Sequence, residues 1–255
     1  MDLDLPRAGL ELYKSASQRA RVATELWGAA NLFCPSCKAD RLELLPNNTS
    51  AVDYLCEECQ SYFQLKSQSK AFGKKIVDAA YSKMKSAILE DRTPNLYVLH
   101  YDPVEWRVRT LVLIPHFAFT LSALERRNAL KLTARRAGWV GCNILLDQIP
   151  VDARISIVNN ERVVANASVR HAYERVRPLQ NLAVEMRGWT LDVLQTVRSL
   201  NRAVFTLSDL YAHEQRLAEL HPRNLHIRDK IRQQLQALRD LGFIEFRERG
   251  SYRLR

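Results

Sequence analysis

Four of the five cysteines form two closely spaced pairs. Cys34 with Cys37 and Cys56 with Cys59 are both C-x-x-C motifs, and 18 residues lie between the motifs. A C-x-x-C turn aims two thiolates at one point, and Zn²⁺ accepts four of them tetrahedrally at about 2.3 Å. The spacing therefore predicts a structural zinc site. Because sulfur fills all four positions, this metal would hold the fold and do no chemistry.

A second group of reactive side chains flanks the second cysteine pair. Segments 52–55 and 62–66 have strand-like composition, and an antiparallel hairpin that turns across the cysteines puts Asp53 opposite Gln64. Because side chains alternate along a strand, Gln64 and Lys66 share a face with Asp53. Asp53 and Gln64 offer oxygen ligands for Mg²⁺, and the Lys66 side chain can orient or deprotonate water beside a phosphate. The hairpin thus brings together the groups that metal-assisted phosphate hydrolysis needs.

An Asp followed about ten residues later by Glu, Asp or Gln-x-Lys, on a hairpin behind an N-terminal helix, is the arrangement of the PD-(D/E)xK nucleases. The spacing alone is common, and the same residues also suit a solvated strand face. A zinc loop at the turn favours the nuclease interpretation, because it would fix the strand register that a metal site requires. Glu25, on the predicted first helix, is a candidate for a further metal carboxylate; the alternative is an ordinary solvated acid.

The charge balance favours a polyanionic partner. Lys and Arg number 38 against 28 Asp and Glu, a formal net charge of +10, and nucleic acid is the leading candidate. No apolar run approaches the roughly 18 residues of a membrane helix. The first four residues carry acid where a signal peptide carries base, so the chain is expected to stay in the cytoplasm, with no membrane partner and with its cysteines reduced.

The elements around these motifs have the pattern of an α/β domain. Apolar residues recur at helical spacing over 10–30 and again over 76–89. Strand-like runs lie at 52–55, 62–66, 96–101 and 107–114, and a further hairpin is expected over 154–164. The order helix, strand, strand, helix, strand, strand favours an α/β core over a barrel or a bundle.

The C-terminal part of the chain has a different pattern. Segment 167–182 contains Pro178 and has no clear period, which predicts a linker. Helical segments follow at 189–200, 207–220 and 225–241, and a hairpin pairs 243–247 with 251–254. Three helices and a two-stranded ribbon are the order of a winged helix. We therefore predict a catalytic domain over residues 1–181 and a winged-helix DNA-binding domain over residues 182–255.

Four blocks of sequence are specific enough to compare with known proteins. They are Tyr13 to Trp27 leading into the first cysteine pair, Leu65-Lys66-Ser67, Thr133 to Ile144, and Lys230 to Gln236. Together these blocks resemble the methyl-directed restriction endonucleases of the DpnI type, which cleave duplex DNA at G-A-T-C when the adenine carries an N6-methyl group. The resemblance spans nearly the whole chain.

The resemblance implies a fold and an activity. The expected fold is an α/β (α+β) restriction-endonuclease-like core with a zinc knuckle, followed by an α+β winged-helix domain. The expected activity is Mg²⁺-dependent cleavage of methylated double-stranded DNA by a bacterial, cytoplasmic restriction–modification enzyme, and we expect the chain to be a monomer. One departure separates this chain from the family pattern, which has Glu before x-Lys where this sequence has Gln64. The alternative is therefore a catalytically inactive reader of methylated DNA.

Reading N6-methyladenine needs an apolar surface in the major groove beside hydrogen-bonding groups. Trp139, with Arg135 and Arg136 close by, offers that combination, and the resemblance implies that this indole lies beside the methyl groups. The alternative role for Trp139 is that of a core residue.

The last predicted helix is the candidate recognition helix. Its apolar residues Ile227, Ile231, Leu235 and Leu238 recur on one face, which leaves polar side chains on the other. Arginine and glutamine can contact guanine and adenine edges, and basic residues on the wing would meet phosphate. The predicted DNA-binding residues of this domain are Arg228, Lys230, Arg232, Gln233 and, on the wing, Arg249.

Overall fold

The computed structural model describes residues 1–46 and 52–255. Its contacts group the chain into two compact units, each assembled from separate stretches. The first unit comprises 1–73, 92–116 and 152–177, and the second comprises 74–91, 117–151 and 178–255. The second unit therefore includes two stretches that the sequence analysis assigned to the catalytic domain. The domain boundary at residue 181 stays a prediction.

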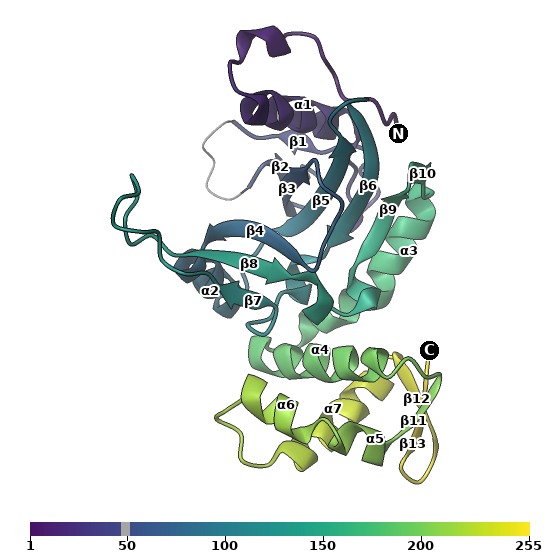
Figure 1. The fold of residues 1–255 in the computed structure, drawn as a ribbon. Coiled ribbons are helices and arrows are strands. Elements are labelled where there is room, and N and C mark those ends of the chain that lie inside the picture. The colour runs from purple at the N-terminus through teal and green to yellow at the C-terminus, as the bar shows by residue number, and fades with distance from the viewer. Residues whose placement is uncertain (47–51) are drawn as a thin grey trace. The chain divides into compact units, whose positions relative to one another are not determined.

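The first unit contains a mixed sheet, which among the described residues has the strand order β1-β2-β3-β5-β6-β9-β10 (Figure 1). The strands are β1 (Glu43–Leu44), β2 (Tyr54–Leu55), β3 (Tyr62–Gln68), β5 (Asn95–Asp102), β6 (Arg107–Ile114), β9 (Ile155–Asn159) and β10 (Arg162–Val163). Neighbours pair antiparallel except β3 and β5, which are parallel. A parallel pair requires a long crossover, and here the chain passes through the second unit between these two strands.

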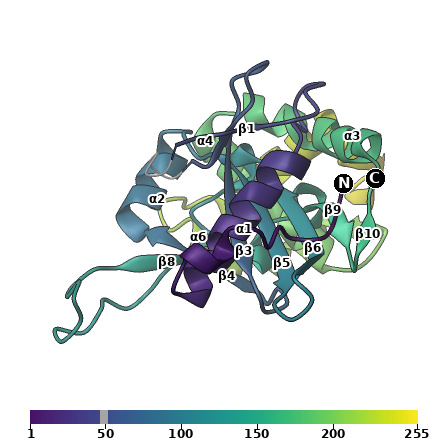
Figure 2. The same ribbon diagram turned by 90° about the horizontal axis from the view of Figure 1, so that it is seen from above.

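Two α-helices of the first unit pack against this sheet. They are α1 (Ala16–Asn31) and α3 (Asn166–Val176); a short 3-10 helix lies at Leu10–Leu12, and another, Arg177–Asn181, follows α3 and leads into the second unit. Figure 2 shows α1 running across the sheet, where it contacts β3. The N-cap of α1 is Ser15, whose Oγ accepts a hydrogen bond from the Gln18 N–H at 3.2 Å. Thr24 Oγ1 and Ser67 Oγ, 3.0 Å apart, join α1 to β3.

The second unit contains two smaller sheets, each with three strands among the described residues. The first has the order β4-β8-β7 and carries α2; the second has the order β11-β13-β12 and belongs to the winged-helix part. The elements are β4 (Lys75–Ala80), α2 (Tyr81–Leu89), β7 (Leu124–Arg126), β8 (Gly141–Leu145), α4 (Val184–Ser199), β11 (Val204–Thr206), α5 (Leu207–Tyr211), α6 (Glu214–Leu220), α7 (Ile227–Asp240), β12 (Ile244–Glu248) and β13 (Ser251–Leu254). Further 3-10 helices lie at His116–Ala118, Leu146–Gln148 and Val151–Ala153.

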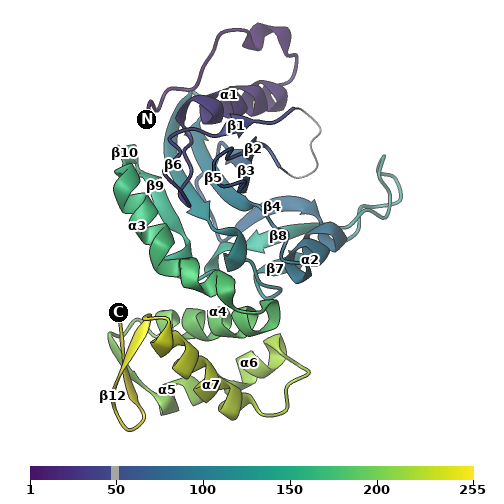
Figure 3. The ribbon, with the colours of Figure 1, turned by 180° about the vertical axis from the view of Figure 1, so that it is seen from behind.

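The winged-helix prediction is confirmed in its main features. Figure 3 shows α7 packed among α4, α5 and α6, and β12 and β13 form the ribbon that follows. The predicted apolar face of α7 is buried. A third strand, β11, pairs with β13, and α5 begins at Thr206 in a capping box with Asp209. The predicted helix over 207–220 is divided in two, because the helical backbone ends at Tyr211 and resumes at Glu214.

Several sequence predictions are wrong, and the cause in each case is a contact between residues far apart in the chain. Residues 76–80, predicted as the start of a helix, belong to β4 because they pair antiparallel with β8. Segment 167–182, predicted as a linker, is helical: α3 buries Val169, Tyr173 and Val176, and a 3-10 helix follows. The first helix begins at Ala16 instead of residue 10.

No helix in the described part of the chain is both long enough and apolar enough to cross a membrane.

A close approach between α1 and the β2–β3 hairpin depends on one glycine. A Cβ built on Gly28 would lie 2.2 Å from Tyr54 Oη and 2.8 Å from Cζ. Tyr54 is fully buried, and its hydroxyl donates a hydrogen bond to the Glu25 carbonyl at 2.9 Å. The side chain therefore cannot move aside, so the absence of a Cβ at Gly28 is what lets α1 lie against the hairpin.

We expect Gly28→Ala to lower the free energy of unfolding by about 1–3 kcal/mol, the usual cost of overpacking a filled site. Gly188→Ala on α4 is the matched control: nothing lies within 4 Å of the added Cβ. That variant should be more stable by about 0.5–1 kcal/mol, because alanine is the better helix former. Urea denaturation of both variants measures the difference, and equal stabilities would show that the Tyr54 contact does not restrict α1.

Candidate functional site

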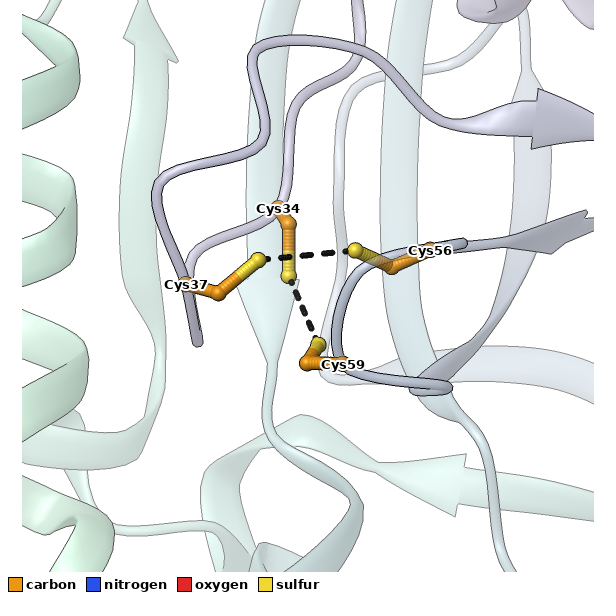
Figure 4. Close-up of side chains that lie close together, drawn as sticks. All are labelled: Cys34, Cys37, Cys56 and Cys59. Atoms are coloured by element: carbon orange, nitrogen blue, oxygen red, sulfur yellow. Dashed lines mark hydrogen bonds between the residues drawn. The ribbon is translucent and has the colours of Figure 1, made fainter.

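The four paired cysteines meet in the first unit. Their sulfur atoms lie within 4.8 Å of one another. The close contacts, 3.5 Å each, join Cys34 to Cys59 and Cys37 to Cys56, so each links one motif to the other (Figure 4). The cluster can bind zinc, as the spacing predicts. The fifth cysteine, Cys142, lies apart in β8, buried, with its sulfur 3.3 Å from the Ala79 carbonyl oxygen.

The chemistry of the four thiols fits a metal ion. Burial raises the pKa of Cys34, since the charged form is costly without a nearby cation. At Cys59 burial also raises the pKa, but hydrogen bonds with Ser61 and the neighbouring thiols outweigh it and bring the pKa to about 7. A bound cation deprotonates such thiols outright. The Ala39 N–H already points at Cys37 Sγ, 3.4 Å away.

An arginine from α3 holds the loop of the first motif. Arg170 Nε donates to the Cys34 carbonyl at 3.2 Å, and Nη2 lies within 3.2 Å of the Lys38 and Ala39 carbonyls and the Asp40 carboxylate. Its guanidinium also lies over the Phe33 ring, 5.2 Å from the centroid. Sequence reasoning missed Arg170, because it lies more than 130 residues from the loop it contacts.

The second cysteine loop is the turn of the β2–β3 hairpin, and it sets the strand register. Tyr54 pairs with Phe63 and Leu55 pairs with Tyr62, which confirms the predicted register. One further step along the same register places Asp53 at the level of Gln64.

Two hydrogen bonds fix Asp53 in that position. Its main-chain N–H donates to the Phe63 carbonyl at 2.9 Å, and its carboxylate Oδ2 accepts from the Leu65 N–H at 2.7 Å. These bonds lie on either side of Gln64 in the sequence of β3. Lys66 is near enough to lower the pKa of Asp53. The three residues that the sequence analysis selected are therefore brought together by the hairpin.

Helix α1 adds a carboxylate and a guanidinium. Burial raises the pKa of Glu25, Arg21 lowers it, and the Asp53 carboxylate raises it further. Burial likewise raises the pKa of Asp53, by more than the Leu65 N–H, Lys66 and Arg21 lower it. The Arg21 side chain lies 3.7 Å from Glu25. Two partly buried carboxylates, one of which raises the pKa of the other, with cations beside them, are an arrangement that a divalent metal ion stabilises.

Trp139 lies at the base of a segment that joins β7 to β8. Residues 127–140 form a ribbon in which the Leu130 N–H donates to the Trp139 carbonyl at 2.9 Å and the Gly138 N–H donates to the Leu130 carbonyl at 3.1 Å. The indole lies so close to Gly141 that an added Cβ there would be 2.7 Å from the ring. Trp139 is half-buried.

One face of Trp139 is covered by Arg136, whose guanidinium lies 4.8 Å from the ring centroid. The indole also borders a cavity of about 650 Å³. The other lining residues come from the β4–α2 junction, α2, the end of β7 and the end of the ribbon: Ala80, Tyr81, Ser82, Lys85, Ser86, Leu89, Arg126, Gly138 and Val140.

Two family profiles match this chain. The profile of the DpnI family, described as a Dam-replacing family, covers residues 1–182. The chain belongs to the DpnI family. A second profile, described as the Dam-replacing HTH domain, covers residues 185–254. The matches support a methyl-dependent restriction enzyme family with DpnI-type two-domain architecture, as the sequence blocks indicated, and they support DNA binding.

In the HTH domain of this DpnI family member, the predicted DNA-binding residues differ in how far their side chains are exposed. Arg228, Arg232 and Gln233 on α7 are exposed, and Arg249 is exposed at the turn between β12 and β13. Lys230 is half-buried, with its ammonium 5.9 Å from the centroid of the Trp189 ring.

The two arginines of α7 already have partners. Arg228 Nε lies 2.8 Å from a Glu214 carboxylate oxygen, and Arg232 pairs with Asp229 and donates to Tyr211 Oη at 2.7 Å. Exposed ion pairs of this kind contribute little to the stability of the fold, so both guanidinium groups can exchange these partners for a nucleic acid.

Proposed function

We propose that this DpnI family member is a Mg²⁺-dependent endonuclease that cleaves double-stranded DNA at G-A-T-C sites carrying N6-methyladenine. The observation that supports it best is the position of Asp53, with its carboxylate held on the Leu65 N–H of β3 and Lys66 close by. The profile match to the DpnI family supports the class of activity.

In this proposal Asp53 and Gln64 hold Mg²⁺, with Glu25 as a further carboxylate. When bound, the ion neutralises charge on the scissile phosphate and helps to activate water. The carboxylate of Asp53 is already oriented by its hydrogen bond from the Leu65 N–H, so it would need little rearrangement to bind the metal ion. As an ammonium, Lys66 orients the attacking water and offsets the charge that develops on the phosphate; as a neutral amine it would instead accept the proton of the water.

The Gln64 departure is compensated by α1. An amide oxygen can bind Mg²⁺ but brings no negative charge, so a Gln at this position lowers the charge of the ligand set by one. Asp53 lies close enough to Glu25 for its carboxylate to raise the pKa of Glu25. A ligand set with two negative charges is therefore present without an acid at position 64. This favours an active nuclease over the alternative, a catalytically inactive reader of methylated DNA.

In this proposal the indole of Trp139 recognises the methyl group. The indole offers the apolar surface that a methyl group in the major groove requires, and it borders a cavity. Arg135 and Arg136, on the same ribbon, would contact phosphate. Arg228, Lys230, Arg232 and Gln233 of α7 and Arg249 of the wing would contact the duplex separately. With two DNA-reading parts on one chain, the enzyme would act as a monomer in the bacterial cytoplasm, within a restriction–modification system.

The proposed zinc ion is structural. Cys34, Cys37, Cys56 and Cys59 would hold it and leave no ligand position for water. Because the second motif is the turn of the hairpin, zinc affinity and the register of β2 with β3 are coupled.

We expect one Zn²⁺ per chain. We also expect Cys56→Ser to lower thermal stability strongly, because the free energy of zinc binding contributes to the free energy of folding. Elemental analysis and thermal unfolding measure both quantities. Cys142→Ala is the control and should retain one zinc per chain. A zinc-free purified protein, or a Cys56→Ser variant with unchanged stability, would contradict the proposal.

For catalysis, we expect Asp53→Ala and Lys66→Ala to reduce cleavage of a methylated plasmid by at least about 100-fold. Binding to the methylated site should stay within a few-fold, because these residues act on the phosphate after docking. Gln64→Glu should keep or raise activity by restoring a carboxylate. Lys70→Ala, an exposed lysine just beyond β3, is the control and should cut at the wild-type rate.

Two outcomes would change the conclusion. Wild-type cleavage by Lys66→Ala would show that the active site lies elsewhere. A wild-type protein that binds but does not cut, together with a Gln64→Glu variant that cuts, would establish the inactive reader.

We expect Trp139→Ala to reduce discrimination between methylated and unmethylated G-A-T-C duplexes by about 1–3 kcal/mol, the usual value of one base-edge contact. Affinity for unmethylated duplex should change little, since the methyl contact is absent there. Binding titrations with both duplexes measure the ratio. An unchanged ratio would show that the indole only supports the ribbon.

A further inference from the structure

The ribbon of residues 127–140 extends away from the sheet that carries it. Figures 1, 2 and 3 all show this segment, between β7 and β8, reaching out from the β4-β8-β7 sheet. Its side chains are exposed except Ala134, Trp139 and Val140, which are half-buried. The two arms are joined by main-chain hydrogen bonds near the base. The ribbon therefore holds its shape without a hydrophobic core of its own.

The ribbon is strongly basic. It carries Arg127, Lys131, Arg135 and Arg136 and contains no Asp or Glu. Such a density of cations on a projecting segment favours contact with phosphates of a nucleic-acid backbone.

An apolar side chain is exposed near the tip of the ribbon. Leu132, between Lys131 and Thr133, is 92% exposed. Leu12, Val104 and Leu225 are exposed to a similar degree, 81%, 84% and 88%. Leu12 and Val104 are each next to an acid, Glu11 and Glu105, and Leu225 lies between Asn224 and His226. Leu132 is thus an apolar group on a segment whose only charges are positive. Proteins that unstack DNA use this combination, in which basic groups hold the backbone and an apolar wedge enters between two base steps.

We propose that Leu132 inserts between base pairs of the duplex, close to the methylated site. The proposal rests on the proposed function, because Trp139 at the base of the same ribbon marks the methylated adenine. Leu130 is hydrogen-bonded across the ribbon to Trp139, and Leu132 lies two residues further toward the tip. At about 3.3 Å per extended residue this is at most about 7 Å. Since stacked base pairs are about 3.4 Å apart, the wedge enters at most about two base pairs from the base that Trp139 contacts.

Insertion gives Leu132 a role that differs from that of Trp139. Unstacking depends on the shape and apolarity of the wedge, so it should occur with methylated and unmethylated duplex alike once the ribbon is in place. Methyl discrimination should then be unaffected by Leu132, while affinity and the distortion of the duplex depend on it.

The test uses the full chain in Ca²⁺, which allows binding to be measured on uncut DNA. Duplexes with one methylated G-A-T-C site carry the fluorescent base 2-aminopurine at each of the four positions beyond the site in turn. With the wild-type protein we expect fluorescence to rise at least about twofold at the position directly next to the site, about two base pairs from the methylated adenine, because an unstacked base is less quenched. Leu132→Ser should abolish the rise and weaken binding about tenfold, and Leu132→Met should retain both properties.

Leu12→Ser is the matched control for loss of an exposed leucine and should leave the signal unchanged. Because Leu132 is almost fully exposed, its variants should unfold at the wild-type temperature, so a lost signal cannot be ascribed to misfolding. The proposal is overturned if no position responds to the wild-type protein, or if Leu132→Ser responds as the wild type does.

Cleavage of the same duplexes in Mg²⁺ separates this failure from failure of the proposed function. A wild-type protein that cuts methylated duplex without any 2-aminopurine signal refutes the wedge and leaves the nuclease function intact. A protein that neither binds nor cuts methylated duplex refutes both.

Discussion

Four cysteine thiols converge in the first unit, and the loop that carries two of them is also the turn of the β2–β3 hairpin. Sulfur contacts that join one motif to the other fix where that turn begins and ends. The strand register follows from the turn, and Asp53 reaches the level of Gln64 only in this register. A slip by one residue would send Gln64 and Lys66 to the opposite face. The geometry of the candidate active site therefore depends on a cluster that takes no part in its chemistry.

The second constraint is the approach of α1 to the same hairpin. Gly28 lets the helix lie against Tyr54, and the tyrosine hydroxyl binds the main chain at Glu25. This contact places Arg21 and Glu25 of α1 near Asp53 of the hairpin. A partly buried group of charged side chains is thereby formed from the helix and the hairpin. Burial raises the pKa of both carboxylates, because it disfavours the charged form of each. Together they form the kind of site whose charge a divalent cation balances, even with a neutral Gln64.

The residues proposed to read DNA lie on other elements and are held less tightly. Trp139 is fixed by its contact with Gly141 and by the Arg136 guanidinium, at the base of a ribbon with no core of its own. The arginines of α7 lie on the exposed side of a helix whose buried face is largely apolar, and they use exposed acids as partners. Exposed cations with weak partners suit a polyanionic ligand, because little stabilisation is lost when they exchange partners.

The sequence by itself determined the features that depend on local spacing. The two C-x-x-C motifs predicted the thiol cluster, strand alternation predicted the hairpin register, and helical periodicity predicted the buried face of α7. These features follow because turn geometry and side-chain period act between residues close in the chain. Tertiary structure alone decided the rest. Residues 75–80 are a strand because β8 supplies their hydrogen-bonding partner, α3 forms where a linker was predicted because it has a sheet to pack on, and Arg170 holds a loop far away in sequence. The position of Glu25 beside Asp53 and the partial exposure of Trp139 likewise depend on packing between distant segments, which no local pattern encodes.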